Sequence, residues 1–124
     1  MRVVDTSAWI EGLIRGGNGN AISHELPLRS RWIVPTIVQL ELAKWLSRNA
    51  TYDEAAAIMA FTTRCIVVEL TTPIALHAAE LCRQCKLSTA DAIIYATTLH
   101  TDADLLTCDA LFMDLPRVHY LTKA

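Results

Sequence analysis

The sequence predicts an α/β protein in which helices cover a parallel β-sheet, and three observations support this prediction. Short β-branched runs alternate along the chain with longer helical segments, which is the order that produces parallel strands with helical connections. No linker, internal repeat or low-complexity segment interrupts the alternation. The chain has 124 residues, the size of one domain with a substantial core. We therefore expect residues 1–124 to form a single domain.

In the first half of the chain, apolar runs predict two strands, and capping or breaking residues bound the helices between them. Ser7 can cap the first helix, and the glycine-rich residues 16–19 end it. The predicted elements are, in order, a strand at 2–5, a helix from Ser7 to about Arg15, a short helix near 21–26, a strand at 31–34 and a helix from Pro35 or Thr36 to about Arg48.

The second half continues the alternation with longer helices. Pro73 suits a first helical turn because its missing N–H is not needed there, and the Ser88 hydroxyl can accept a hydrogen bond from the turn that follows it. The predicted elements are a helix at 52–64, a strand at 66–70, a helix from 72 to about 86, a helix from 88 to about 100, and strands at 105–107 and 118–121.

Four acidic residues occur where the surrounding sequence is apolar. Asp5 ends the first strand, Asp109 follows residues 103–107, and Asp91 opens an almost wholly apolar helix. Glu41 falls inside the apolar arc of its helix rather than on the side of Gln39, Ala43 and Ser47. Isolated carboxylates are costly to bury and usually acquire a counter-charge, a proton or a metal. If the fold brings these four together, their repulsion favours a divalent cation between them.

Each of these carboxylates also has a purely structural interpretation. Lys44 lies three residues after Glu41 and can form an ordinary helix pair with it. Ser88 and Asp91 match a capping box, and each strand-end aspartate can form a cap or an Asx turn. Ligands gather at the C-terminal ends of parallel strands near a switch in strand order. The four acids together therefore indicate a site more strongly than any one of them does.

Composition and charge narrow the setting. The formal net charge is -2, but without the four acids 11 basic residues face 9 acidic ones, which permits nucleic-acid binding without indicating it. No apolar run approaches the roughly 20 residues of a membrane span, and Met1-Arg2 leads directly into a strand rather than a secretory signal. We therefore expect a cytoplasmic protein. The 52% hydrophobic content, with Trp9, Trp32 and Trp45, predicts buried helices and a homodimer.

The cysteines and histidines do not predict a second site. Cys82 and Cys85 resemble half of a zinc or redox motif, but they lie near the end of a predicted helix, and Cys65 and Cys108 supply no second pair. We expect buried structural thiols, since free cysteine packs as a small hydrophobe. The four histidines show no mutual spacing typical of a metal site or a catalytic triad: His24, His77, His100 and His119.

Two other α/β folds that gather carboxylates around a metal fit less well. A receiver domain needs a phospho-accepting Asp after its third strand and a Lys late in the sheet, and neither residues 70–72 nor the last strands supply them. A haloacid-dehalogenase-like phosphatase needs Asp-x-Asp after the first strand, whereas this chain has Asp5-Thr6-Ser7.

Four short motifs, spread over the whole chain, contain the four acids. They are Val-Asp-Thr-Ser-Ala-Trp at 4–9, Pro-Thr-Ile-Val-Gln-Leu-Glu-Leu at 35–42, Ser-Thr-Ala-Asp-Ala-Ile-Ile-Tyr-Ala at 88–96 and Leu-Thr-Cys-Asp-Ala-Leu-Phe at 106–112. In content, order and spacing they resemble the motifs of PIN-domain ribonucleases, particularly the VapC-type toxins of toxin–antitoxin pairs. Each motif is short, but the ordered set of four is quite specific.

The resemblance implies a compact α/β/α sandwich with a parallel sheet of about five strands. It implies an Mg²⁺- or Mn²⁺-dependent endoribonuclease that leaves a 3′-hydroxyl and a 5′-phosphate, and it implies a cognate antitoxin and a homodimer as partners. The residues that match the family site are Asp5, Glu41, Asp91 and Asp109 as the acidic set, with Thr6 or Ser7 and Thr107 as hydroxyls that line it. Of the acids, Asp5 and Asp91 are the best candidates for direct metal ligands.

One position departs from the family pattern. Many relatives have a further Asp or His directly before the residue that matches Phe112, and this chain has Leu111 there. The fifth position therefore has no polar side chain, which is compatible with a weakly held second metal ion. The alternative to an enzyme is a non-catalytic PIN-like module that binds RNA or protein. The presence of all four acids favours the enzyme, and loss of activity on adding a chelator would distinguish the two.

Overall fold

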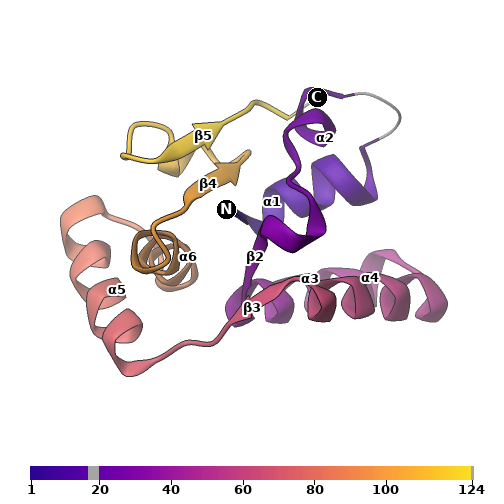
Figure 1. Ribbon diagram of the computed structural model, residues 1–124, viewed down its shortest axis with the longest axis horizontal. Helices are drawn as coiled ribbons and strands as arrows, with labels where there is room; N and C mark the ends of the chain where they lie inside the picture. The colour runs from indigo at the N-terminus through magenta and orange to yellow at the C-terminus, as the bar shows by residue number, and fades with distance from the viewer. Residues whose placement is uncertain (17–19, 124) are drawn as a thin grey trace.

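The computed structural model describes residues 1–16 and 20–123 and has a five-stranded sheet at its centre (Figure 1). All neighbouring strands run parallel, in the order β3-β2-β1-β4-β5. This confirms the predicted α/β class and the sheet of about five strands. The strands are β1 (Arg2–Val4), β2 (Trp32–Pro35), β3 (Ile66–Val68), β4 (Asp104–Thr107) and β5 (Val118–Tyr120).

Helices cover both faces of this sheet, as the predicted three-layer sandwich requires. In Figure 1, α5 and α6 lie on one side of the strands, and α1 and α2 lie on the other. None of the described helices is both long and apolar enough to cross a membrane. The helical elements are α1 (Thr6–Ala8), the π-helix η1 (Trp9–Ile14), α2 (Ala21–Glu25), the 3-10 helix η2 (Arg29–Arg31), α3 (Thr36–Asn49), α4 (Tyr52–Arg64), α5 (Thr72–Cys85), α6 (Thr89–His100) and the 3-10 helix η3 (Ala110–Phe112).

The strand order reverses at β1. The chain adds β2 and β3 on one side of β1, and then returns to add β4 and β5 on the other. Crevices for ligands form at such a reversal, at the C-terminal ends of the strands. Asp5 directly follows β1, and Asp109 lies two residues after β4. The topology therefore places both residues at the edge where a ligand site is expected.

The core explains why β1, β4 and α6 are so apolar. Val3, Val4, Leu105 and Leu106 are fully buried, as expected for central strands of a parallel sheet covered on both faces. Residues 92–98 of α6 are buried as well, which agrees with the absence of a polar face in its sequence. A helix this apolar rests on the sheet with its first turn at the crevice, and that turn contains Asp91.

The first helix differs from its prediction. The N-cap is Asp5, whose side chain accepts from the Thr6 N–H, and not Ser7, whose hydroxyl instead donates to Asp5. After Ala8 the helix widens into the π-helix η1 instead of continuing as an α-helix to Arg15. Of the predicted helix-breaking segment 16–19, residues 17–19 lie outside the described ranges.

Two of the three tryptophans do not support the predicted dimer in the way we expected. Trp9 and Trp32 are 0% and 2% exposed, and their ring centroids lie 4.4 Å apart beside Phe61 of α4. Both rings are buried because β2, the π-helix η1 and α4 meet at this point of the core. The apolar side chains that do reach the surface lie elsewhere, and they include Tyr52, Ile66, Val67, Leu70 and Leu76.

Candidate active site

Asp5 is the most buried of the four acids, with 4% of its surface exposed. Its Oδ1 accepts from the Thr6 N–H at 2.8 Å, and its Oδ2 accepts from the hydroxyls of Ser7 at 2.7 Å and Thr107 at 2.8 Å. These bonds lower the pKa of Asp5, but burial has the larger effect and raises it, with a contribution from the charge of Glu41. Asp5 is thus held in place by donors that are all uncharged.

Glu41 reaches the same region from α3. The Thr6 hydroxyl donates to Glu41 Oε1 at 2.7 Å, so Thr6 bridges two carboxylates, using its backbone N–H for Asp5 and its side chain for Glu41. The structural alternative was an ion pair with Lys44. Within residues 1–16 and 20–123, Glu41 has no ion pair within 4.0 Å. Its contact with Thr6 therefore fixes the side chain toward the crevice.

Asp91 lies in the first turn of α6 and is half-buried. Its N–H donates to the Ser88 hydroxyl at 3.4 Å. The reciprocal side-chain bond that completes a capping box is formed by Thr51 and Glu54 in α4, and is not found between Asp91 and Ser88. Burial raises the pKa of Asp91 to about 6, with further contributions from the charges of Asp5 and Asp109. The cap thus uses the Asp91 N–H rather than its carboxylate, and the carboxylate is repelled by its acidic neighbours.

Asp109 completes the set from the loop after β4. Its Oδ1 accepts from the Leu111 N–H at 2.9 Å, which caps η3. Its own N–H donates to the Thr107 hydroxyl at 2.9 Å, and that hydroxyl also donates to Asp5. The cap interpretation of Asp109 is therefore correct, but it occupies only one of the two carboxylate oxygens. Thr107 is fully buried and links the ends of β1 and β4.

The four carboxylates form one electrostatic unit. The charges of Asp5, Asp109 and Glu41 all act on Asp91, and the described residues contain no Lys, Arg or His within 4.0 Å of any of the four. Oxygen donors of this kind suit a hard divalent cation. In the described ranges, however, no group of three or more His, Cys, Asp or Glu side chains is arranged to hold a metal ion as it stands. An ion that retains several waters would fit this looser set.

Other side chains behave partly as predicted. All four cysteines are free thiols, but the expected burial holds only for Cys108, and the other three are half-buried. Burial raises the pKa of both Cys65 and Cys108 to about 11. Leu111, at the position where the family pattern has a polar residue, is 63% exposed. The spacing of the histidines did not predict that His77 and His100 would meet, yet their Nδ1 and Nε2 atoms lie 3.0 Å apart between α5 and α6.

The structure combines a parallel α/β fold with four carboxylates at the strand-order reversal, and sequence comparison identifies the family. The PIN domain family matches residues 2–118. The chain therefore belongs to the PIN domain family, as its four motifs predicted. Among curated proteins, no relative matches the sequence.

Solved structures show the same fold at low sequence identity. A toxin–antitoxin complex from Klebsiella pneumoniae has 19% identity and a TM-score of 0.80, covering 98% of this chain and 100% of that one. VapBC2 from Rickettsia felis, bound to a DNA fragment from its promoter, has 14% identity and a TM-score of 0.75, covering 99% and 98%. VapC20 from Mycobacterium tuberculosis, a Sarcin–Ricin loop cleaving toxin, has 23% identity and a TM-score of 0.64, covering 85% and 87%.

Proposed function

We propose that this protein is a divalent-metal-dependent endoribonuclease and the toxin of a type II toxin–antitoxin pair, with residues 1–124 as one PIN domain acting in the cytoplasm. The observation that carries the proposal is the uncompensated acidic set at the strand-order reversal. Four carboxylates from four elements repel one another there, and no cation of the described chain balances them. A fold tolerates such repulsion when a ligand relieves it.

The donor set fits Mg²⁺ or Mn²⁺. PIN nucleases generally need a divalent metal, and carboxylate oxygens without thiol or imidazole partners favour a hard ion. Asp5 and Asp91 would hold it directly, and Glu41 and Asp109 would complete the shell, through water or around a second ion. When bound, such an ion polarises the phosphoryl group and lowers the pKa of a coordinated water.

The chain's own residues supply positioning and proton transfer. Thr6, Ser7 and Thr107 fix the carboxylates through the bonds of 2.7–2.8 Å described above, in the manner of residues that orient metal ligands. A carboxylate of the set that retains a free oxygen orients the attacking water and accepts its proton. Attack in line with the leaving oxygen breaks the P–O3′ bond, and yields a 3′-hydroxyl and a 5′-phosphate.

An incubation with structured RNAs tests this function. We expect the purified protein to cleave RNA with Mg²⁺ or Mn²⁺, and to stop when EDTA is added. The similarity to a toxin that cleaves the Sarcin–Ricin loop makes a ribosomal RNA stem-loop a sensible first substrate. Cleavage that persists in EDTA would exclude the metal mechanism. RNA binding without cleavage under any metal would support the alternative, a non-catalytic PIN-like module.

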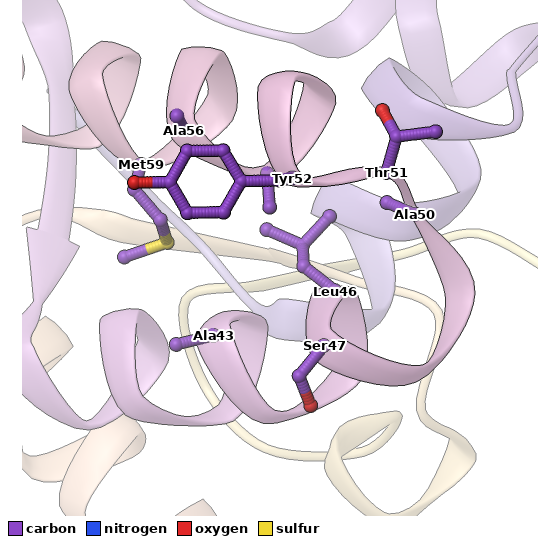
Figure 2. A pocket seen from close by; sticks show the side chains of 9 residues that line it. Ala43, Leu46, Ser47, Ala50, Thr51, Tyr52, Ala56 and Met59 are labelled. Carbon is purple, nitrogen blue, oxygen red and sulfur yellow. The ribbon is translucent and has the colours of Figure 1, made fainter.

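The proposal includes an antitoxin as partner, and α3 and α4 offer it an apolar surface. Between these helices lies a hollow of about 460 Å³. Figure 2 shows Leu46, Tyr52 and Met59 around the space, with small side chains such as Ala43 and Ala56 on the two helices. Tyr52 is 88% exposed, so its ring is free to close on an apolar segment. Several structures with this fold are complexes of toxin and antitoxin.

The protein encoded by the adjacent reading frame would be the antitoxin to test. A small DNA-binding protein there should co-purify with this chain. We expect the exposed residue Ala56, changed to Glu, to weaken that complex by placing a charge in the hollow. The homodimer is proposed on the exposed apolar residues near β3 and α5, namely Ile66, Val67, Leu70 and Leu76. A monodisperse monomer in light scattering at micromolar concentration would argue against it.

A further inference from the structure

Four residues form a continuous stripe along α3 that begins at the acidic site. Glu41, Lys44, Trp45 and Arg48 are spaced at i, i+3, i+4 and i+7, so one face of the helix carries all four. Together with Asn49 they line a shallow hollow of about 220 Å³. At 1.5 Å per residue the stripe extends about 10 Å along the helix axis from Glu41. Because the hollow and the acidic site share Glu41, the two are contiguous.

The stripe changes from negative to positive with distance from the acidic site. Lys44 and Arg48 are both exposed, and neither has an ion-pair partner within 4.0 Å in the described part of the chain. Other exposed arginines in the described ranges, such as Arg83, also lack a partner within this distance, but Lys44 and Arg48 differ from them in position, because they line the same hollow as Glu41. An RNA backbone that enters the acidic centre would bring its phosphates next to these two cations, which can bind them.

An aromatic side chain, Trp45, lines the same hollow as these two cations. The Trp45 ring is half-buried and packs against the core, and the guanidinium of Arg15 lies over it at 5.4 Å from the ring centroid. Indole rings and guanidinium planes are the groups on which unpaired bases stack. The stripe therefore offers stacking and phosphate contacts side by side.

We propose that this stripe is the subsite that positions a single-stranded RNA segment beside the carboxylates. Lys44 and Arg48 bind backbone phosphates, and the Trp45–Arg15 pair stacks an unpaired base. A single strand is required because stacking on a side chain needs a base that is not paired in a helix. This inference rests on the proposed ribonuclease function and adds its substrate-binding residues.

The stripe is separate from the hollow proposed for the antitoxin. On α3, the antitoxin hollow is lined by residues that each follow a stripe residue by two positions. They are 43, 46, 47 and 50, against 41, 44, 45 and 48 in the stripe. Two residues correspond to about 200° around a helix, so the two surfaces lie on nearly opposite sides of α3. Changes on one surface should therefore leave the other intact.

Salt-dependent binding tests the phosphate contacts. We would measure fluorescence anisotropy of a labelled unpaired RNA oligonucleotide in the Asp5→Asn background, where no cleavage is expected. Lys44→Ala and Arg48→Ala should each lower the slope of log Kd against log salt by about 0.7, the value for one lost phosphate contact on a single strand. Arg83→Ala is the matched control, because Arg83 is an exposed arginine on α5. It should leave both the slope and the affinity unchanged.

Tryptophan fluorescence tests the stack. Trp9 and Trp32 are at most 2% exposed, so quenching by added RNA would report on Trp45. Trp45→Phe should abolish the quenching and retain most of the affinity. Trp45→Leu should weaken binding about 5- to 150-fold, the range for one lost base–aromatic stack. Unchanged quenching in Trp45→Phe would overturn the stacking role, whether or not Trp45→Leu folds.

Kinetics separate this inference from the proposed function. In the active protein, Lys44→Ala and Arg48→Ala should raise KM for RNA more than they lower kcat. If the wild type cleaves RNA but these variants keep its KM and its salt slope, the subsite is wrong and the ribonuclease function stands. If the wild type cleaves no RNA, the proposed function fails, and the anisotropy slopes still decide the subsite. An equal loss in Arg83→Ala would overturn the subsite, because it would show binding by overall charge.

Discussion

The strands β1 and β4 lie side by side and carry carboxylates at both ends, but in opposite electrostatic settings. At their N-terminal ends, Arg2 and Asp104 are register partners. Arg2 donates from Nε and Nη2 to the two oxygens of Asp104, each at 2.8 Å, and from Nη1 to Glu25 at 3.0 Å. At their C-terminal ends, Asp5 and Asp109 have only N–H and O–H donors.

The difference appears in the pKa values. The hydrogen bond from Arg2 holds the pKa of Asp104 below its ordinary value, whereas burial among other acids raises the pKa of Asp91 to about 6. Paired carboxylates stabilise the fold, and uncompensated ones cost stability until a ligand binds. One end of the strand pair is thus built for stability, and we propose that the other is built for catalysis.

The largest expected effect is on cleavage. Asp5→Asn should reduce RNA cleavage by at least about 100-fold, the upper range for loss of a residue that orients metal ligands. Metal-free stability should be equal or higher, because the change removes a charge that burial and Glu41 both disfavour. Asp104→Asn, at the paired end of the same strands, is the control and should keep its cleavage rate. Equal cleavage rates in Asp5→Asn and Asp104→Asn would show that the unpaired carboxylates at the C-terminal end matter no more for catalysis than the paired one at the N-terminal end.

The second prediction concerns Thr107, which joins the two strands at the catalytic end. Thr107→Val removes the donor to Asp5 and the acceptor for the Asp109 N–H, so both carboxylates lose their orientation. We expect a loss of cleavage of about 10- to 100-fold, the usual cost of removing a hydrogen bond that orients a metal ligand. Thr107→Ser keeps the hydroxyl and should retain most activity. An equal loss of cleavage in Thr107→Val and Thr107→Ser would mean that the shape of the Thr107 side chain, and not its hydroxyl, supports activity.

Much of this arrangement could be predicted from local pattern. Apolar runs and capping residues placed every strand and the long helices to within a few residues, because burial on both faces leaves a clear signature in β1, β4 and α6. The motif order indicated that Asp5, Glu41, Asp91 and Asp109 belong together. The structure brings them into one electrostatic unit, and their catalytic roles stay a prediction.

Contacts between distant segments could not be predicted. Thr107 meets Asp5 and Arg2 meets Asp104 across 102 positions of sequence each, and neither contact has a local pattern. The second contact forms because Asp104 starts β4 opposite Arg2. The prediction that Ser7 caps the first helix was wrong for a related reason. Its hydroxyl has better partners in Asp5 and in the Cys108 N–H, which only the folded sheet edge supplies.

The third prediction breaks the paired end. Arg2→Met leaves Asp104 and Glu25 without their cation, and charge-assisted hydrogen bonds contribute about 1.5–3 kcal/mol each. Both carboxylates are 41% exposed, so water compensates part of this loss, and we expect a destabilisation of about 1–2 kcal/mol by urea unfolding. The cleavage rate of the folded fraction should not change. A fall in that rate would show that the N-terminal end also positions the acids.

The smallest effect, and the most direct test of the contrast, is the pH dependence of stability. The pKa of Asp91 is raised in the folded state, so the native protein keeps this proton longer than the unfolded chain. Its contribution to stability is therefore present below about pH 4, near the ordinary Asp pKa, and is lost as pH rises toward about 6. The pKa of Asp104 is lowered, so its contribution is present above about pH 4 and is lost in more acidic solution.

Thermal melts in EDTA from acidic to neutral pH should show these opposite signs. Relative to the wild type, Asp91→Asn should gain stability as pH rises from about 4 to about 6, because the variant no longer carries the charge that its neighbours repel. Asp104→Asn should be less stable than the wild type above about pH 4, where the charged Asp104 pairs with Arg2, and this deficit should shrink in more acidic solution as the wild type loses the pair. Parallel profiles for the two variants would show that the two strand ends do not differ electrostatically. A gain for Asp91→Asn that disappears on adding Mn²⁺ would further indicate that the ion relieves the same repulsion.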